Sequence, residues 1–379
     1  MVKLGNSRLT LFLSYGGSLQ GWYEAGVIER EMAIYHRLLD SLGGLDLFSY
    51  GTSNEEHFHC NRYNNCRALI WPFQKGRRFH DRLGPLLHCR SLTTSSVFKT
   101  NQINGSMAAV RAKKLYGKPL VVRCGYLLSA NAKREGDSGP DLIRKVEYER
   151  TCFKAADLCI VTTKRDKSEI VDAYGIDAQS VRVIPNYVNT DIYTLKPTPS
   201  KVPGSLVFVG RLSKEKNLFS LLNAVERVNN INKLTIVGDG PLREELEKRS
   251  LKIKTDVTFL GRRQSAEIPA IIAAHDIFVI CSHYEGMPKA LIEAMSLGMP
   301  CLGTDVRGIR DIIRHKNNGL LCHTSVEGIA AGLDTLANQP ILCERLGAIA
   351  KKDATFTYGI EAITTLELDV IAEAIEKTK

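Results

Sequence analysis

Residues 206–217 read LVFVGRLSKEKN, an apolar run that ends in a glycine and passes into a charged loop. A short apolar run followed by a loop and a helix-like stretch is typical of one βα unit. The unit repeats along the second half of the chain, where we expect strands at 206–209, 234–237, 257–260, 277–281, 300–303 and 320–322. Such alternation predicts a mainly parallel sheet covered by helices.

The first half of the chain shows the same alternation. The apolar runs that we expect to form strands lie at 8–14, 45–50, 68–72, 119–124, 158–162 and 181–184. The proline-rich stretch 194–204 separates the two halves and is typical of a linker. We therefore predict an α/β fold of two Rossmann-like, doubly wound domains, 1–193 and 205–355, which face each other across a ligand-binding cleft. The last helical stretch, 356–379, is expected to pack back toward the N-terminal domain.

The composition of the 379 residues is ordinary for a globular protein, with 44% hydrophobic and 24% charged residues. No run of 18 apolar residues is present, and the first residues lack the apolar core of a signal peptide. Ten cysteines are scattered without paired spacing, which favours reduced thiols. These features predict a cytoplasmic protein.

The positive charge is concentrated in the first half. Residues 1–193 carry +8 of the formal net charge of +10, from 27 Lys and Arg against 19 Asp and Glu. Between Arg62 and Arg134, fifteen basic residues accompany a single acid, Asp81. This concentration predicts an anionic partner or a membrane surface for the N-terminal half.

The stretch EGMPKALIE, residues 285–293, places two carboxylates eight residues apart. Pro288 suits the first position of a helix, so we expect a helix that starts just after Glu285 and whose free N–H groups form a seat for a diphosphate. Gly286 lets a ligand approach the backbone closely. Eight residues span about 12 Å of helix, more than the roughly 5 to 9.5 Å between the paired carboxylates of a glycosidase. Glu285 and Glu293 are therefore expected to serve different parts of one long ligand.

The loop that begins at Gly210 carries two cations, Arg211 and Lys216. Two cations at the end of a strand can neutralise the charge that develops on a departing nucleoside diphosphate, a task that metal ions perform elsewhere. This interpretation predicts a site with no metal ion and no cofactor. The alternative is a pair of solvated loop cations.

The chain resembles the retaining glycosyltransferases of family 4, which have the GT-B fold. The resemblance rests on three elements in the family's order, GRLSKEKN at 210–217, VGDGP at 237–241 and EGMPKALIE at 285–293. It is specific from about residue 205 to 322 and extends more weakly through 157–161 and 184–188.

The resemblance implies roles for individual residues. Glu285 matches the residue that contacts the donor sugar, and Glu293 the residue that contacts the nucleotide ribose. Arg211 and Lys216 match the family's diphosphate-binding pair. The backbone that faces the phosphates matches Gly286, Met287 and Pro288. A metal-independent transfer with retention of configuration follows from this resemblance.

Three further donor-site candidates rest on the resemblance. Arg262 corresponds to a loop near the nucleotide base, although a solvated loop is equally consistent with its sequence. Gly16 and Gly17 follow the first strand, where the family has a glycine-rich loop that faces donor and acceptor. Their spacing to Gly21 does not match the dinucleotide fingerprint G-x-G-x-x-G, which disfavours NAD binding.

One region departs from the family. Many members carry a histidine after the central strand of the N-terminal domain, whereas VVRCGY at 121–126 places Arg123 and Tyr126 there. Both are candidates for contact with an acceptor phosphate or carboxylate. A structural arginine paired at the end of a strand is the alternative for Arg123.

The basic clusters suggest where the acceptor binds. Lys75, Arg77 and Arg78 are interleaved with Trp71, Phe73 and Phe79, and a second cluster is RAKK at 111–114. Apolar rings among cations suit a surface that meets anionic lipid, so the acceptor-binding candidates include Lys75, Arg77 and Arg78. A solvated basic face is the alternative, and no nucleic-acid-binding module is present. His57, His59, Cys60 and Cys66 have irregular spacing and do not predict a metal site.

The sequence therefore predicts a retaining hexosyltransferase. It would move a sugar from a nucleoside diphosphate sugar to a glycan or lipid-linked acceptor, in polysaccharide or glycolipid synthesis. It would lie in the cytoplasm, with peripheral attachment at the inner face of the membrane. The alternatives are a sugar-nucleotide epimerase on the same fold and a non-catalytic sugar-nucleotide-binding subunit.

Overall fold

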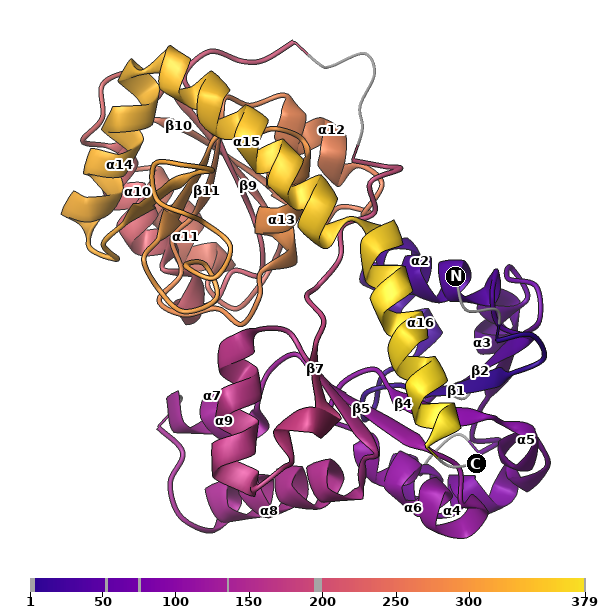
Figure 1. The fold of residues 1–379 in the computed structure, drawn as a ribbon. Helices are drawn as coiled ribbons and strands as arrows, with labels where there is room; N and C mark the ends of the chain where they lie inside the picture. Colours follow the sequence, from indigo (N-terminus) through magenta and orange to yellow (C-terminus); the bar gives the residue numbers. More distant parts are fainter. Residues whose placement is uncertain (1–3, 52–53, 74–75, 135, 194–199, 378–379) are drawn as a thin grey trace. The chain divides into compact units, whose positions relative to one another are not determined.

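The computed structural model describes residues 4–51, 54–73, 76–134, 136–193 and 200–377. The chain forms two compact units (Figure 1): unit 1 comprises Met1–Pro185 and Ile363–Lys379, and unit 2 comprises Asn186–Ala362. Unit 2 thus begins before the expected linker. Its first residue, Asn186, donates a hydrogen bond from Nδ2 to the carbonyl of Met287 at 2.8 Å. Residues 194–199 of the expected linker lie outside the described residues.

Unit 1 is built on a parallel sheet with the strand order β3-β2-β1-β4-β5-β6-β7. The order reverses between β1 and β4, as in a doubly wound domain. Its strands are β1 Arg8–Phe12, β2 Gly44–Phe48, β3 Cys66–Leu69, β4 Val97–Thr100, β5 Leu120–Cys124, β6 Leu158–Val161 and β7 Val181–Val183.

Strand β4 is absent from the strands expected from the sequence. Its four residues include Lys99, which interrupts the apolar character that marks a buried strand. The Lys99 side chain is nevertheless buried, and its Nζ lies 3.4 Å from Oε2 of Glu367. Burial lowers the pKa of Lys99, while the neighbouring Glu367 carboxylate acts in the opposite direction.

The helices of unit 1 pack on both faces of this sheet. They are α1 Leu19–Glu24, α2 Ile28–Leu39, α3 Asn54–Cys60, α4 Arg77–Leu87, α5 Cys89–Thr94, α6 Ser106–Tyr116, α7 Leu128–Arg134, α8 Pro140–Ala155 and α9 Lys164–Tyr174. In the core, the ring of Phe12 stacks on Phe48 at 4.9 Å and meets Phe98 edge-on at 5.6 Å. These rings come from β1, β2 and β4, the three strands around the reversal of strand order.

The C-terminal helix α16, Ile360–Glu376, belongs to unit 1 from Ile363 onward. It begins after Gly359 and lies within the last segment expected from the sequence, 356–379. Glu367 of α16 is buried and accepts a hydrogen bond from Arg123 at 3.0 Å in addition to its ion pair with Lys99. Nearer the end of the helix, Arg182 lies 2.5 Å from Glu373.

Unit 2 is built on a second parallel sheet, with the order β10-β9-β8-β11-β12-β13. Its strands are β8 Ser205–Val209, β9 Lys233–Val237, β10 Asp256–Gly261, β11 Ile277–Ile280, β12 Cys301–Thr304 and β13 Leu320–Cys322. Its helices are α10 Leu218–Val225, α11 Arg243–Ser250, α12 Ile268–Ala273, α13 Lys289–Ser296, α14 Val326–Asn338 and α15 Pro340–Tyr358. The predicted strands of this half are all confirmed, and the order reverses between β8 and β11.

Successive residues of β8 face the two cores of unit 2, as the alternation of a strand requires. Leu206 and Phe208 pack in one cluster with α10, α11 and α14, whereas Val207 packs in the other with α12, α13 and α15. Within the described residues, no helix is both long and apolar enough to cross a membrane.

The first prediction concerns the buried carboxylate of α16. We expect Glu367→Ala to destabilise unit 1 by about 3–5 kcal/mol, because Lys99 and Arg123 would remain buried without their counter-charge. Glu373→Ala is the matched control on the same helix; its pair with Arg182 is about one-third exposed, so we expect about 1 kcal/mol or less. Both tryptophans, Trp22 and Trp71, lie in unit 1, so urea unfolding followed by tryptophan fluorescence reports this unit. Equal losses for the two variants would contradict the prediction.

Candidate functional site

The loop after β8 is held in a tight turn at the carboxyl end of the sheet of unit 2. Gly210 follows β8, and its carbonyl lies so close to Gly238 that a Cβ at Gly238 would come within 1.9 Å of it. Gly238 also has a φ of 130°, a backbone conformation that side chains disfavour. The VGDGP element therefore uses glycine so that the loop after β9 can pack directly on the loop after β8.

The same loop ends in a short 3-10 turn, Lys214–Lys216, that leads into α10. Asn217 joins the two helices in the left-handed conformation, with a φ of 55°, which asparagine tolerates better than most residues. Its side chain donates a hydrogen bond to the carbonyl of Thr324 at 2.8 Å. This contact holds the backbone just after Lys216.

Lys216 forms an ion pair with Glu285, the first acid of the EGMPKALIE motif. The Lys216 Nζ and Glu285 Oε1 atoms are 2.6 Å apart, and the side chains are 18% and 10% exposed. Glu285 Oε1 also accepts a hydrogen bond from the hydroxyl of Ser282, at 2.6 Å. The sequence predicts both charged residues for the site, and the structure brings them into direct contact.

Two further hydrogen bonds join the loop after β8 to the loop after β11. The backbone N–H of His283 donates to the carbonyl of Glu215 at 2.8 Å, and the thiol of Cys281 donates to the carbonyl of Lys216 at 3.2 Å. Strands β8 and β11 are neighbours at the point where the strand order reverses. In doubly wound sheets this position, at the carboxyl ends of the strands, is where ligands bind.

Helix α13 begins next to this pair. It starts at Lys289, so Pro288 is the N-cap residue and not the first helical residue that the sequence predicts. Proline has no side-chain acceptor for the first N–H groups of the helix, and no side-chain cap is formed. The first N–H groups of α13 therefore lie immediately after Gly286 and Met287, with no side-chain cap from Pro288.

The backbone before α13 is packed from two sides. Gly308 has a φ of 83°, and a Cβ there would lie 2.1 Å from the carbonyl oxygen of Gly286. Met287 is buried, and its sulfur and carbonyl both accept hydrogen bonds from Asn186, at 3.2 and 2.8 Å. The turn expected to face the phosphates thus has a fixed conformation.

The remaining candidates of unit 2 differ in exposure. Glu293 lies inside α13 and is 3% exposed, so only a small part of its carboxylate is accessible. Arg211 is exposed, and no hydrogen bond or ion pair of its side chain is found among the described residues. Arg262 is also exposed and lies 4.0 Å from Asp239. The expected spacing of about 12 Å assumed one continuous helix from Glu285 to Glu293. Helix α13 covers only Lys289–Ser296, so Glu285 lies outside the helix.

The glycine-rich loop of unit 1 follows β1. Gly17 donates its N–H to the carbonyl of Ser14 at 2.6 Å, and Gly16, with a φ of 78°, lies under the guanidinium of Arg77. The helix that follows is capped by a carboxylate of the chain itself. Buried Glu56 accepts hydrogen bonds from the N–H groups of Leu19 and Gln20, at 3.0 and 2.9 Å. The start of α1 is therefore already occupied by a negative group.

The acceptor-site candidates of unit 1 differ in burial and in their partners. Arg123 is buried and is committed to Glu367, which favours the structural alternative that the sequence left open. Tyr126 is 43% exposed. Arg77 and Arg78 are exposed at the start of α4, and Lys75 lies outside the described residues.

The histidines and cysteines near β3 have separate environments. The sulfurs of Cys60 and Cys66 are 2.6 Å apart and buried, and both residues are free thiols. His59 contacts Gln20 at 2.8 Å. Within the described part of the chain, no three His, Cys, Asp or Glu side chains are arranged to hold a metal ion.

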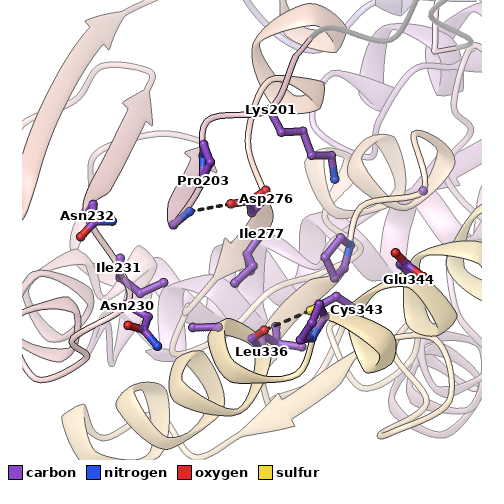
Figure 2. Close-up of a pocket in the computed structure, with 15 residues that line it drawn as sticks. Lys201, Pro203, Asn230, Ile231, Asn232, Asp276, Ile277, Leu336, Cys343 and Glu344 are labelled. Carbon is purple, nitrogen blue, oxygen red and sulfur yellow. Dashed lines mark hydrogen bonds between the residues drawn. The ribbon is translucent and has the colours of Figure 1, made fainter.

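A cavity of about 660 Å³ in unit 2 lies at the amino ends of inner strands of the sheet, and Figure 2 shows residues that line it. Its walls include Gly204, Asp276 and Pro300, which immediately precede β8, β11 and β12. Asp276 Oδ2 accepts a hydrogen bond from the N–H of Gly204 at 2.7 Å. None of the predicted site residues lines this cavity, so it is distinct from the site at the carboxyl ends.

Sequence reasoning missed the residues that support Glu285. Ser282 follows the predicted strand 277–281, and a hydroxyl at the carboxyl end of a strand is a signal that could have identified it. Thr304 stabilises Ser282 by donating a hydrogen bond to its carbonyl at 2.6 Å. Gly308 gives no local signal, because its role depends on a contact with Gly286 across the fold.

Comparison with known proteins adds independent evidence. A family model described as "Glycosyl transferases group 1" matches residues 196–353, and one described as "Glycosyltransferase Family 4" matches residues 46–192. An uncharacterized glycosyltransferase of Methanocaldococcus jannaschii is 27% identical, over 67% of this chain and 67% of its own length. The lipopolysaccharide core biosynthesis glycosyltransferase LpsD of Rhizobium meliloti is 32% identical, over 45% of this chain and 50% of its own length. The match thus spans about half the length of LpsD.

Solved structures show the same fold over nearly the whole chain. The crystal structure of Anabaena HepE in complex with UDP and glucose has a TM-score of 0.76 and 18% identity, and the match covers 96% of this chain and 99% of HepE. Sucrose-phosphate synthase from Thermosynechococcus elongatus has a TM-score of 0.78 and 16% identity, with coverage of 98% and 100%. The two Rossmann-like sheets therefore form a GT-B fold.

The contact between Gly308 and Gly286 generates the second prediction. We expect Gly308→Ala to destabilise unit 2 by roughly 1–3 kcal/mol more than Gly298→Ala, because its Cβ would displace the backbone beside Glu285. Gly298 is the matched control: its φ is 76°, and its Cβ would meet the nearest atom at 3.7 Å, an ordinary contact. Circular dichroism during urea unfolding measures both. Similar destabilisation by the two variants would show that the backbone contact is unimportant.

Proposed function

The chain belongs to the GT-B glycosyltransferases of the family 4 type, and on this premise we propose that it transfers a hexose from a nucleoside diphosphate sugar to a glycan or lipid-linked acceptor. The proposal places the transfer in the synthesis of a cell-surface polysaccharide or glycolipid. The relatives support this choice, since LpsD is named for lipopolysaccharide core biosynthesis. An Escherichia coli relative, 32% identical over 41% of this chain, is named as a galactosyltransferase acting on a diphosphoundecaprenol-linked sugar.

The ion pair of Lys216 and Glu285 is the observation that carries the proposal. It places a cation and a carboxylate together at the reversal of strand order, beside the start of α13, where Pro288 provides no side-chain cap. A nucleoside diphosphate sugar has matching chemistry, with a doubly charged diphosphate next to a polyhydroxylated ring. The cation and the helix N–H groups suit the diphosphate, and the carboxylate suits the sugar hydroxyls.

In the proposed reaction the bond between the sugar C1 and the diphosphate oxygen breaks as negative charge develops on the diphosphate. Lys216, exposed Arg211 and the N–H groups at the start of α13 stabilise that charge. The acceptor hydroxyl attacks C1 from the face that the diphosphate leaves, and its proton passes to the departing diphosphate oxygen. Attack from that face retains the configuration at C1.

Glu285 is proposed to orient the donor sugar. Its carboxylate is held by Ser282 and Lys216, at 2.6 Å each, so its position is fixed before the donor arrives. A preorganised acceptor of hydrogen bonds selects one orientation of the sugar hydroxyls. When the diphosphate binds, Lys216 can interact with both anions, and this contact would connect the sugar to the leaving group.

The third prediction tests the donor and the absence of a metal requirement. We expect UDP to bind in calorimetry without a divalent cation, with GDP and ADP as competing probes of the base. Transfer should continue in EDTA, because Arg211 and Lys216 supply the positive charge; removing one such group costs about 10² to 10³ in rate. Activity that disappears in EDTA and returns with magnesium or manganese would contradict metal independence. Failure of all three diphosphates to bind would contradict the proposed donor.

The fourth prediction separates the two acids of the motif. Glu285→Ala should reduce transfer at least about 100-fold while leaving UDP binding unchanged or stronger, because the variant frees the positive charge of Lys216. Glu293→Gln keeps the size of a buried side chain and should weaken UDP binding, since this residue is proposed to contact the ribose. Glu247→Ala, which removes a half-exposed pair with Arg243 on α11, is the control. Equal loss of UDP binding in the Glu285 and Glu293 variants would reject this division of roles.

A further inference from the structure

Helix α4 of unit 1 exposes an apolar stripe to solvent. Phe79 is 61% exposed, and the leucines at 83, 86 and 87 are 46%, 55% and 48% exposed. Their spacing of three and four residues places them on one side of the helix. A surface helix of a globular protein normally presents polar residues on its outer side. The outer surface of α4 is therefore partly apolar, whereas a helix that contacts only water would be polar there.

The inner side of α4 is fully engaged, so the helix cannot bury this stripe by rotating. His80 is buried and its ring stacks on Phe48, with the centroids 4.2 Å apart. Gly84 also approaches Phe48 so closely that a Cβ there would come within 2.6 Å of the ring. The hydroxyl of Tyr116 donates a hydrogen bond to the carbonyl of Pro85 at 2.7 Å. These contacts fix which residues of α4 face the protein, and α4 lies against α6 (Figure 1).

Arginines border the apolar stripe. Arg78, Arg82 and Arg90 are exposed, the first two on α4 and the third on α5. The acid in this segment, Asp81, points inward, where Arg111 lies 2.5 Å away and the Tyr50 hydroxyl donates a hydrogen bond at 3.0 Å. The outer surface therefore combines large apolar side chains with net positive charge.

We propose that this surface, formed by Phe79, Leu83, Leu86 and Leu87 with Arg78, Arg82 and Arg90, docks on an anionic phospholipid membrane. The apolar side chains enter the boundary between headgroups and acyl chains, and the arginines contact lipid phosphates. Phe73, which is 62% exposed and lies next to Trp71, adds a further ring near the start of α4. We name these seven residues of α4 and α5 the docking surface.

The chemistry of the docking surface favours a membrane over the other occupants. A second copy of the chain would bring the same arginines toward one another, because an isologous interface pairs a surface with itself. A nucleic acid would satisfy the arginines but would leave four large apolar side chains without an apolar partner. An anionic bilayer satisfies both parts of the surface, and each basic residue near it strengthens binding by roughly fivefold.

This inference does not depend on sugar transfer, since membrane binding needs neither donor nor acceptor. It is compatible with the proposed function because a lipid-linked acceptor is held at such a surface. A failure to bind vesicles would leave the donor predictions unaffected, and a failure to bind UDP would leave this inference unaffected.

The experiment is co-sedimentation of the full chain with vesicles of phosphatidylcholine alone or mixed with phosphatidylglycerol. We expect the chain to bind the mixed vesicles at low salt. Binding to phosphatidylcholine vesicles, and binding to the mixed vesicles in high salt, should each be at least tenfold weaker. The double variants Phe79→Ser with Leu83→Ser and Arg78→Glu with Arg82→Glu should each reduce binding at least tenfold. Their side chains are exposed, so both variants should keep the native circular dichroism spectrum.

Matched controls alter exposed residues outside the docking surface. Ile143→Ser with Phe356→Ser removes apolar side chains that are 63% and 84% exposed, and Lys164→Glu with Arg165→Glu reverses two exposed charges on α9. Both controls should bind vesicles like the wild type. The proposal is overturned if the wild type fails to bind the mixed vesicles at low salt, or if the docking-surface and control variants bind equally. A concentration-dependent dimer abolished by Phe79→Ser with Leu83→Ser, without vesicle binding, would identify a second copy as the occupant.

Discussion

The ion pair between Lys216 and Glu285 joins two loops that leave the sheet of unit 2 where its strand order reverses. Helices lead away from β8 and β11 in different directions at such a point, so the sheet itself does not hold the two loops together. The ion pair, the hydrogen bond from Ser282 and the backbone bond from His283 to Glu215 do so. The Glu285 carboxylate and the Lys216 ammonium group therefore influence each other directly. A change at either residue alters the charge available to a ligand at the other.

Apolar runs predict most of both sheets because a parallel strand is buried on both faces and shows a continuous hydrophobic sequence. Strand β4 lacks this signature because it carries Lys99, whose charge is tolerated in the core through Glu367 of α16. Glu367 also forms an ion pair with Arg123. This pair favours the structural role of Arg123 over contact with an acceptor. A sequence pattern of short range contains no information about a partner that lies more than 240 residues away.

The candidate site was predictable to the extent that its residues belong to contiguous motifs. Arg211, Lys216 and Glu285 follow predicted strands, and the structure has them in the segments after β8 and β11. Glu293 lies inside α13. The contact between Lys216 and Glu285, the N-cap position of Pro288 and the approach of Gly308 depend on three-dimensional packing. In unit 1, the first N–H groups of α1 donate hydrogen bonds to Glu56 of α3. This contact also depends on three-dimensional packing.

The basic residues of unit 1 show why net charge alone does not identify a binding surface. In the second basic cluster, Arg111 is paired with Asp81 and Lys113 with Asp157, so these charges stabilise the fold. Along α4, by contrast, the arginines remain exposed beside an apolar stripe whose periodicity alone would place it in the core. The inward side of α4 is instead set by His80, whose ring stacks on Phe48, and by Gly84, where a Cβ would collide with that ring. The close packing of Phe48 against α4 thus determines that the apolar side of this helix faces outward.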